Sequence, residues 1–153
     1  MGATRRQQKS PDVVELTVPS DARFLEVIHA CIEQVCLQTE CLSDEEIYKI
    51  AWGVHEACVN VIEHAHQFQA SLPLCLQVQL YPNRIEFFIF DEGPGFDLEQ
   101  VPEPDPAQIF ERGRGLFGIR HCMDVVEYCQ ESHRNYLRLV HLLGSLTPHG
   151  ENA

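Results

Sequence analysis

Two β-rich segments joined by a very short turn constrain the fold of this chain most strongly. The runs LCLQVQLY (74–81) and RIEFFIFD (84–91) are separated by Pro82 and Asn83. A connection this short brings two strands together as an antiparallel hairpin. We therefore expect a sheet rich in antiparallel pairs, with the remaining segments packed against it.

Helical and strand patterns continue on both sides of this hairpin. Ser43 and Glu46 form a capping box that marks a clear helix start. Ser20 or Asp21 can cap an earlier helix, in which apolar residues recur at helical spacing. The other expected elements are strands at 13–18, 125–130 and 136–142 and a short helix within 116–126. This order predicts an α+β fold, a two-layer sandwich with a mixed, mostly antiparallel sheet and helices on one face.

The length of 153 residues fits one domain that can bury a core without disulfides or metal. We expect this domain to span residues 12–143, between a disordered N-terminus at 1–11 and a loose C-terminal tail at 144–153. A stretch dense in Gly, Pro and Asp interrupts the domain at 92–115. A loop of this length inside a compact domain is usually functional or mobile.

The formal net charge of −12 limits the partners of the chain. An acidic surface repels phosphate backbones and anionic lipids, so we expect no direct binding of nucleic acid or of a membrane. The seven cysteines include no CxxC pair, which argues against a disulfide framework and indicates a reducing cytoplasm. The start MGATRRQQKS has no apolar run after it and is unlike a secretory signal, and no segment approaches the roughly 18 apolar residues of a membrane span.

Three polar residues stand out in the helix that follows the capping box. At roughly 100° per residue, Glu56, Asn60 and Glu63 gather on the side opposite the apolar residues. A solvated face is the simplest interpretation, but Asn is a poor residue for a helix interior because its amide competes for backbone hydrogen bonds. A zinc site is poorly supported, because HEACV has Val59 where HExxH needs its second His and the HAH pair at 64–66 has no third ligand in view.

A second group of polar residues follows the apolar strand FFIFD. Asp91 ends this strand, and Gly93 and Gly95 come directly after it. Glycines at such a position allow a ligand to approach the backbone closely. A buried Asp is costly unless it is paired, and a ligand with an amino edge, such as adenine, would supply a donor. A plain turn explains DEGPG equally well.

The third motif is RGRGLFGI at 112–119, in which Gly113 and Gly115 precede a helix. Backbone N–H groups at a helix start form an anion site, and Arg112 and Arg114 add positive charge. A phosphate is the natural ligand for such a site. On its own the motif is weak, because a GxG before a helix is more often a capping turn.

Together and in this order, the three motifs resemble the GHKL ATPase superfamily, with ExxxNxxxHA as its N box and DxGxGF and GRGLFGI as its glycine boxes. The segments LTVPSDARFLEVIHACIEQV and GRGLFGIRHCMDVVEY narrow the resemblance to the anti-sigma-factor serine/threonine kinases, also called switch-protein kinases. The resemblance covers roughly residues 13–142. It implies a Bergerat fold that holds ATP and Mg²⁺ between its helices and a lid.

The resemblance also implies a role for each matching residue. On the helix, Asn60 would help to hold Mg²⁺ on the phosphates, Glu56 would be the general base, and His64 would support the site. Asp91 would accept a hydrogen bond from the adenine amino group. The residues implied to contact the rest of the nucleotide are Gly93 and Gly95 beside the base, and Gly113, Arg114, Gly115 and Leu116 in the lid over the phosphates.

Partners follow from the same resemblance. Family members phosphorylate a serine of a small anti-anti-sigma protein of the STAS type, bind an alternative sigma factor and commonly form homodimers. Arg23, at the start of the first helix, is a candidate for the partner surface. The segment SHRNYLRLV at 132–140 departs from the family pattern, which often has a Gly-Thr element there.

Other functions compete with a protein-serine kinase. A non-catalytic regulatory module could bind nucleotide through the same residues and use it to gate partner binding. A detached histidine-kinase catalytic domain would need a dimerising helical hairpin with a phospho-accepting His, and none precedes residue 13. A gyrase-type ATPase would need a transducer domain, for which the chain is too short.

Overall fold

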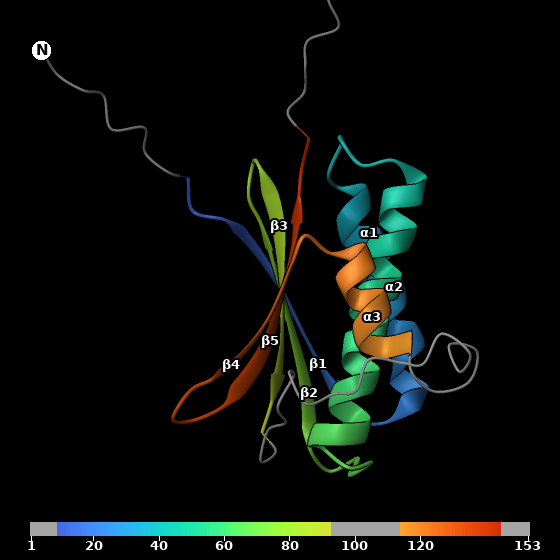
Figure 1. The fold of residues 1–153 in the computed structure, drawn as a ribbon, viewed down its shortest axis with the longest axis vertical. Helices are drawn as coiled ribbons and strands as arrows, with labels where there is room; N and C mark the ends of the chain where they lie inside the picture. Colours follow the sequence, from blue (N-terminus) through green and yellow to red (C-terminus); the bar gives the residue numbers. More distant parts are fainter. Residues whose placement is uncertain (1–8, 93–113, 145–153) are drawn as a thin grey trace, which may run out of the picture.

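The computed structural model of the chain describes residues 9–92 and 114–144 (Figure 1). Most of the expected disordered N-terminus, most of the long glycine-containing loop and most of the expected C-terminal tail lie outside the described residues.

Within residues 9–92 and 114–144, the predicted hairpin is confirmed and forms the centre of a five-stranded sheet. Strands β2 (Pro73–Leu80) and β3 (Arg84–Asp91) pair antiparallel, with Leu76 opposite Ile89. The other strands are β1 (Asp12–Pro19), β4 (Val125–Gln130) and β5 (Asn135–Leu142), in the spatial order β1-β2-β3-β5-β4. The sheet was expected to be mixed and mostly antiparallel, and each of these pairings is antiparallel.

The helices lie where the capping signals predict. A short 3₁₀ turn η1 (Ala22–Phe24) leads into α1 (Leu25–Leu37), and of the two expected caps it is Asp21 that accepts from the Arg23 N–H at 2.9 Å. Helix α2 (Asp44–Asn60) begins with both hydrogen bonds of the Ser43–Glu46 capping box. It continues into a π-helical turn η2 (Val61–Ala65), and α3 (Arg114–Cys122) follows the long loop.

The core lies between the helices and one face of the sheet (Figure 1). Strand residues alternate between faces, so Ile85, Phe87 and Ile89 of β3 are buried against the helical layer. The apolar helical residues on the side opposite Glu56, Asn60 and Glu63 are all buried, namely Ile47, Ile50, Val54, Cys58, Val61 and Ala65. In the described part of the chain, all helices lie on one side of the sheet, as expected.

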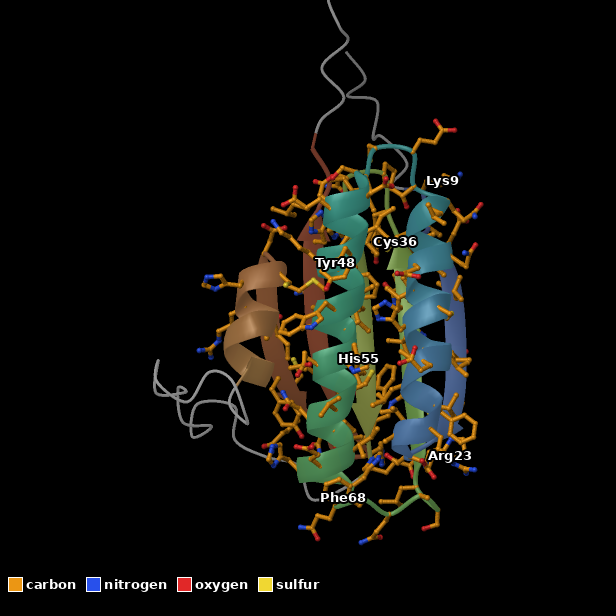
Figure 2. The ribbon with its side chains drawn as sticks, turned by 90° about the vertical axis from the view of Figure 1, so that its right-hand side faces the viewer. Lys9, Arg23, Cys36, Tyr48, His55 and Phe68 are labelled. Atoms are coloured by element: carbon orange, nitrogen blue, oxygen red, sulfur yellow. The ribbon has the colours of Figure 1, made fainter. Side chains whose placement is uncertain are left out.

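Helix α2 lies between α1 and α3 in the helical layer (Figure 2). The contact with α3 is very close, because a Cβ atom built at Gly118 would overlap the indole ring of Trp52. Gly53 of α2 allows a similar approach of Cys122 and Met123. These glycines position α3 on α2, and α3 begins in the GRG motif of the third predicted box.

Candidate nucleotide site

The three elements that carry the predicted motifs share one orientation in the molecule. The C-terminal ends of α2 and β3 and the N-terminal end of α3 all point toward the lower end in Figure 1. A hydrogen bond from the Glu92 N–H to His66 Nε2, at 3.3 Å, joins the end of β3 to the residue that follows η2. The fold thus brings the N box next to the strand end that precedes the first glycine box.

The predicted polar residues of the N box differ in exposure. Glu56 and Asn60 lie one turn apart on α2 and are half-buried, whereas Glu63 is exposed. His64 is also exposed, and its Nε2 lies 4.0 Å from Glu63 Oε2. A fully solvated face would leave all these side chains in water, so half-burial sets Glu56 and Asn60 apart from the end of the helix.

The helix widens directly after Asn60, which the sequence did not predict. The His66 N–H donates to the Val61 carbonyl at 2.8 Å, the spacing of a π-helical turn. Such turns are rare and are frequent at functional sites. The chain then leaves the helix through Gln67 and Phe68, both with left-handed φ angles of 49° and 61°. Each such residue costs on the order of 1–3 kcal/mol, so the surrounding contacts must hold this reversal in place.

His66 provides several of these contacts, and its role was missed in the sequence. Its ring is fully buried. Because Nε2 accepts from Glu92, Nδ1 carries the proton and donates to Ser20 Oγ at 2.6 Å. Burial lowers the pKa of His66, although the nearby charges of Asp91 and Glu92 act in the opposite direction. The neutral imidazole therefore joins the start of η1, the end of α2 and the end of β3.

Among the predicted site residues whose burial the structure describes, Asp91 is the most deeply buried. It is 0% exposed, at the end of β3 on the helix-facing side of the sheet. Its Oδ2 accepts from the Tyr128 hydroxyl at 2.9 Å, and its Oδ1 accepts from Asn135 Nδ2 at 3.2 Å. Neither partner was predicted. A carboxylate can accept about four hydrogen bonds, so capacity remains for a donor on a ligand.

The remaining predicted residues belong to the glycine boxes. Gly93, Gly95 and Gly113 lie outside the described residues. Arg114, Gly115 and Leu116 form the first turn of α3, which confirms a helix start at this motif. Their roles toward base and phosphates stay predictions.

The described residues show neither a metal cluster nor a disulfide nor a membrane-spanning helix. Across residues 9–92 and 114–144, no group of three or more His, Cys, Asp or Glu side chains is arranged to hold a metal ion. All seven cysteines fall in this part of the chain and are free. None of the helices described there is long and apolar enough to cross a membrane.

Comparison with known proteins agrees with this geometry. The family described as the histidine kinase-like ATPase domain matches residues 18–141. A protein named serine-protein kinase RsbW, from Halalkalibacterium halodurans, is 33% identical over 130 residues, which cover 80% of this chain and 78% of that protein. The RsbW proteins of Staphylococcus epidermidis and Bacillus subtilis are 30% and 28% identical over 135 and 128 residues, which cover 82% and 78% of this chain and 84% and 79% of theirs.

A solved structure supports the fold. The crystal structure of the RsbU and RsbW domains of a Mycobacterium tuberculosis protein aligns with a TM-score of 0.62 at 12% identity. The alignment covers 86% of this chain and 32% of that longer chain. The family match and the RsbW relatives show that the chain belongs to the histidine kinase-like ATPase family and, within it, to the family of proteins named serine-protein kinase RsbW. The resemblance drawn from the three motifs is thereby confirmed.

Proposed function

We propose that this chain is an ATP-dependent protein-serine kinase that phosphorylates a STAS-type anti-anti-sigma protein and binds an alternative sigma factor. The observation that carries the proposal is the buried carboxylate of Asp91, which lies at the end of the sheet beside the helix that carries Glu56 and Asn60. A buried carboxylate with unused acceptor capacity suits the amino group of adenine. Membership in a kinase family supports the same assignment.

The residues of α2 fit the phosphate end of such a ligand. Asn60 presents an amide oxygen, a ligand type that Mg²⁺ accepts alongside phosphate oxygens and water. When bound, Mg²⁺ would neutralise charge on the phosphates. Arg114 and the N–H groups of the first turn of α3 would bind the phosphate oxygens, since a helix N-terminus favours anions.

Glu56 has the role of general base in this proposal. It lies one turn before Asn60, so a serine hydroxyl directed at the γ-phosphate would come within its reach. Glu56 takes the hydroxyl proton while the serine oxygen bonds to the γ-phosphorus. The bond between that phosphorus and its bridging oxygen breaks, and ADP leaves with the electron pair.

Partner binding belongs to the proposal as well. The exposed Arg23 at the start of the helical layer, labelled in Figure 2, is a candidate contact for the STAS protein or the sigma factor. The Arg23 Nε lies 3.1 Å from Asp21 Oδ2, so this carboxylate partly balances the charge of Arg23. The acidic surface, with a net charge of −12, suits basic regions of a sigma factor. We further propose a homodimer that works in the cytoplasm.

The test is phosphotransfer from labelled ATP to candidate STAS proteins, measured for Glu56→Gln and for Glu63→Gln as a matched control. We expect Glu56→Gln to bind ATP normally and to lose phosphotransfer by about 10²–10⁴-fold, because a positioned base contributes this much. Glu63→Gln, on the exposed end of the same helix, should transfer phosphate at the wild-type rate. Wild type that binds ATP but transfers nothing to any STAS protein would favour the non-catalytic regulatory module instead.

A further inference from the structure

The hydrogen bonds to Asp91 arise from the register of three strands. Asn135 is the partner of Asp91 in the β3–β5 ladder, and Tyr128 pairs with Leu137 in the β4–β5 ladder. Leu137 is buried in the core, and strand residues two apart share a face. The side chains of Asp91, Asn135 and Tyr128 therefore all lie on the helix-facing side of the sheet.

Each oxygen of the carboxylate has its own donor. Tyr128 donates to Oδ2 and Asn135 donates to Oδ1, at 2.9 and 3.2 Å. Two donors on two different oxygens fix the plane of the carboxylate as well as its position. Both donors are neutral, so they only partly compensate the buried charge, and the unused lone pairs still favour a further donor.

The turn that brings Asn135 to Asp91 is itself held in place. The Glu131 N–H donates to the Arg134 carbonyl at 3.2 Å and closes the β4–β5 turn. On the open face of the sheet, the Arg134 guanidinium lies 3.8 Å from the ring centroid of Phe90, the neighbour of Asp91. This cation–π contact ties the turn to the end of β3.

We propose that Tyr128 and Asn135 are positioning residues that orient Asp91 so that the site selects a purine with a 6-amino group. A fixed carboxylate accepts from the amino group of adenine and repels the 6-oxo group of guanine. The segment 132–140, which departs from the family's Gly-Thr element, thereby acquires a role in base recognition. This inference rests on the proposed function of Asp91 in ATP binding.

The test measures binding of two purine nucleotides by calorimetry in the presence of Mg²⁺. The probes are ATP and purine riboside 5′-triphosphate, which has the same ring system without the amino group. The variants are Tyr128→Phe and Asn135→Leu, each of which removes the donor and keeps most of the side-chain volume. Tyr136→Phe is the control, because Tyr136 lies on the opposite face of β5 against Phe88 and Phe90.

We expect wild type to prefer ATP over purine riboside triphosphate by about tenfold or more, the typical effect of a hydrogen bond to a charged group. Tyr128→Phe and Asn135→Leu should each weaken ATP binding several-fold and change purine riboside triphosphate binding less than twofold. Tyr136→Phe should change neither.

If Tyr128 and Asn135 had a merely structural role, the two variants would lose affinity for both nucleotides alike. That result would overturn the inference. Unchanged ATP binding in both variants would overturn it too. Tyr128→Phe removes a single oxygen, so it keeps the test decisive if Asn135→Leu does not fold. A wild-type protein that binds neither nucleotide would instead contradict the proposed function itself.

Discussion

At the scale of single residues, the end of the sheet is organised by two buried polar side chains, Asp91 and His66. Each joins segments that are distant in sequence, through Tyr128 and Asn135 in one case and Ser20 and Glu92 in the other. The position of Asp91 after an apolar strand revealed it in the sequence. Its partners depend on strand register, which a sequence pattern does not specify.

His66 makes stability depend on pH in a defined direction. Its unfolded-state pKa is near 6.5 and burial lowers the pKa in the folded state, so the unfolded chain binds more protons in the window below about pH 6.5. The folded state therefore loses stability as pH falls through this window. Urea unfolding of wild type from pH 7.5 to 5 should show the midpoint falling with pH, less steeply in His66→Gln.

His64→Gln is the control for this experiment, because His64 is exposed two residues away. It should retain the wild-type pH dependence. A His66→Gln profile that parallels wild type at every pH would remove His66 from this role.

At the scale of elements, most of the architecture follows from local signals. The Ser43–Glu46 capping box, the hairpin at 74–91 and the helix start at the GRG motif are each found where the sequence places them. The π-helical turn at Val61–Ala65 was not predictable, because its sequence continues the ordinary helical pattern. The pairing of β3 with β5 was not predictable either, because β4 comes between these two strands in the sequence but lies at the edge of the sheet.

The close packing of α3 on α2 predicts that a methyl group added at Gly118 lowers the stability of the fold. In an unhindered helix Gly→Ala stabilises by about 0.5–1 kcal/mol. At Gly118 the added methyl would overlap Trp52, so we expect Gly118→Ala to destabilise by about 1–3 kcal/mol despite its better helix propensity. Thermal or urea unfolding measures this directly.

Gly144→Ala is the control substitution, since a Cβ there would have no atom of the described residues within 4 Å. It should change stability by less than about 0.5 kcal/mol. Stabilisation by Gly118→Ala would contradict the close contact between Gly118 and Trp52. Because α3 begins in the predicted phosphate lid, the same variant should also weaken ATP binding.

At the scale of the whole molecule, one layer of helices covers one face of the described sheet, and the C-terminal ends of α2 and β3 point the same way as the N-terminal end of α3 (Figure 1). The fold class and its motifs were accessible from the sequence because each rests on short patterns. The closeness of Asp91 to His66 was not, because 24 residues of chain that include β2 lie between them. The site is thus a property of the assembled layers.

The central claim is that the buried carboxylate at the end of β3 recognises ATP. Its most direct test is calorimetry of Mg²⁺-ATP binding to wild type and Asp91→Asn, with Glu92→Gln as an exposed neighbouring control. We predict micromolar binding by wild type and Glu92→Gln, and loss of at least about tenfold in Asp91→Asn, because its amide presents a donor where acceptors are needed. Equal affinity of a folded Asp91→Asn and wild type would contradict the account, as would the absence of ATP binding by wild type.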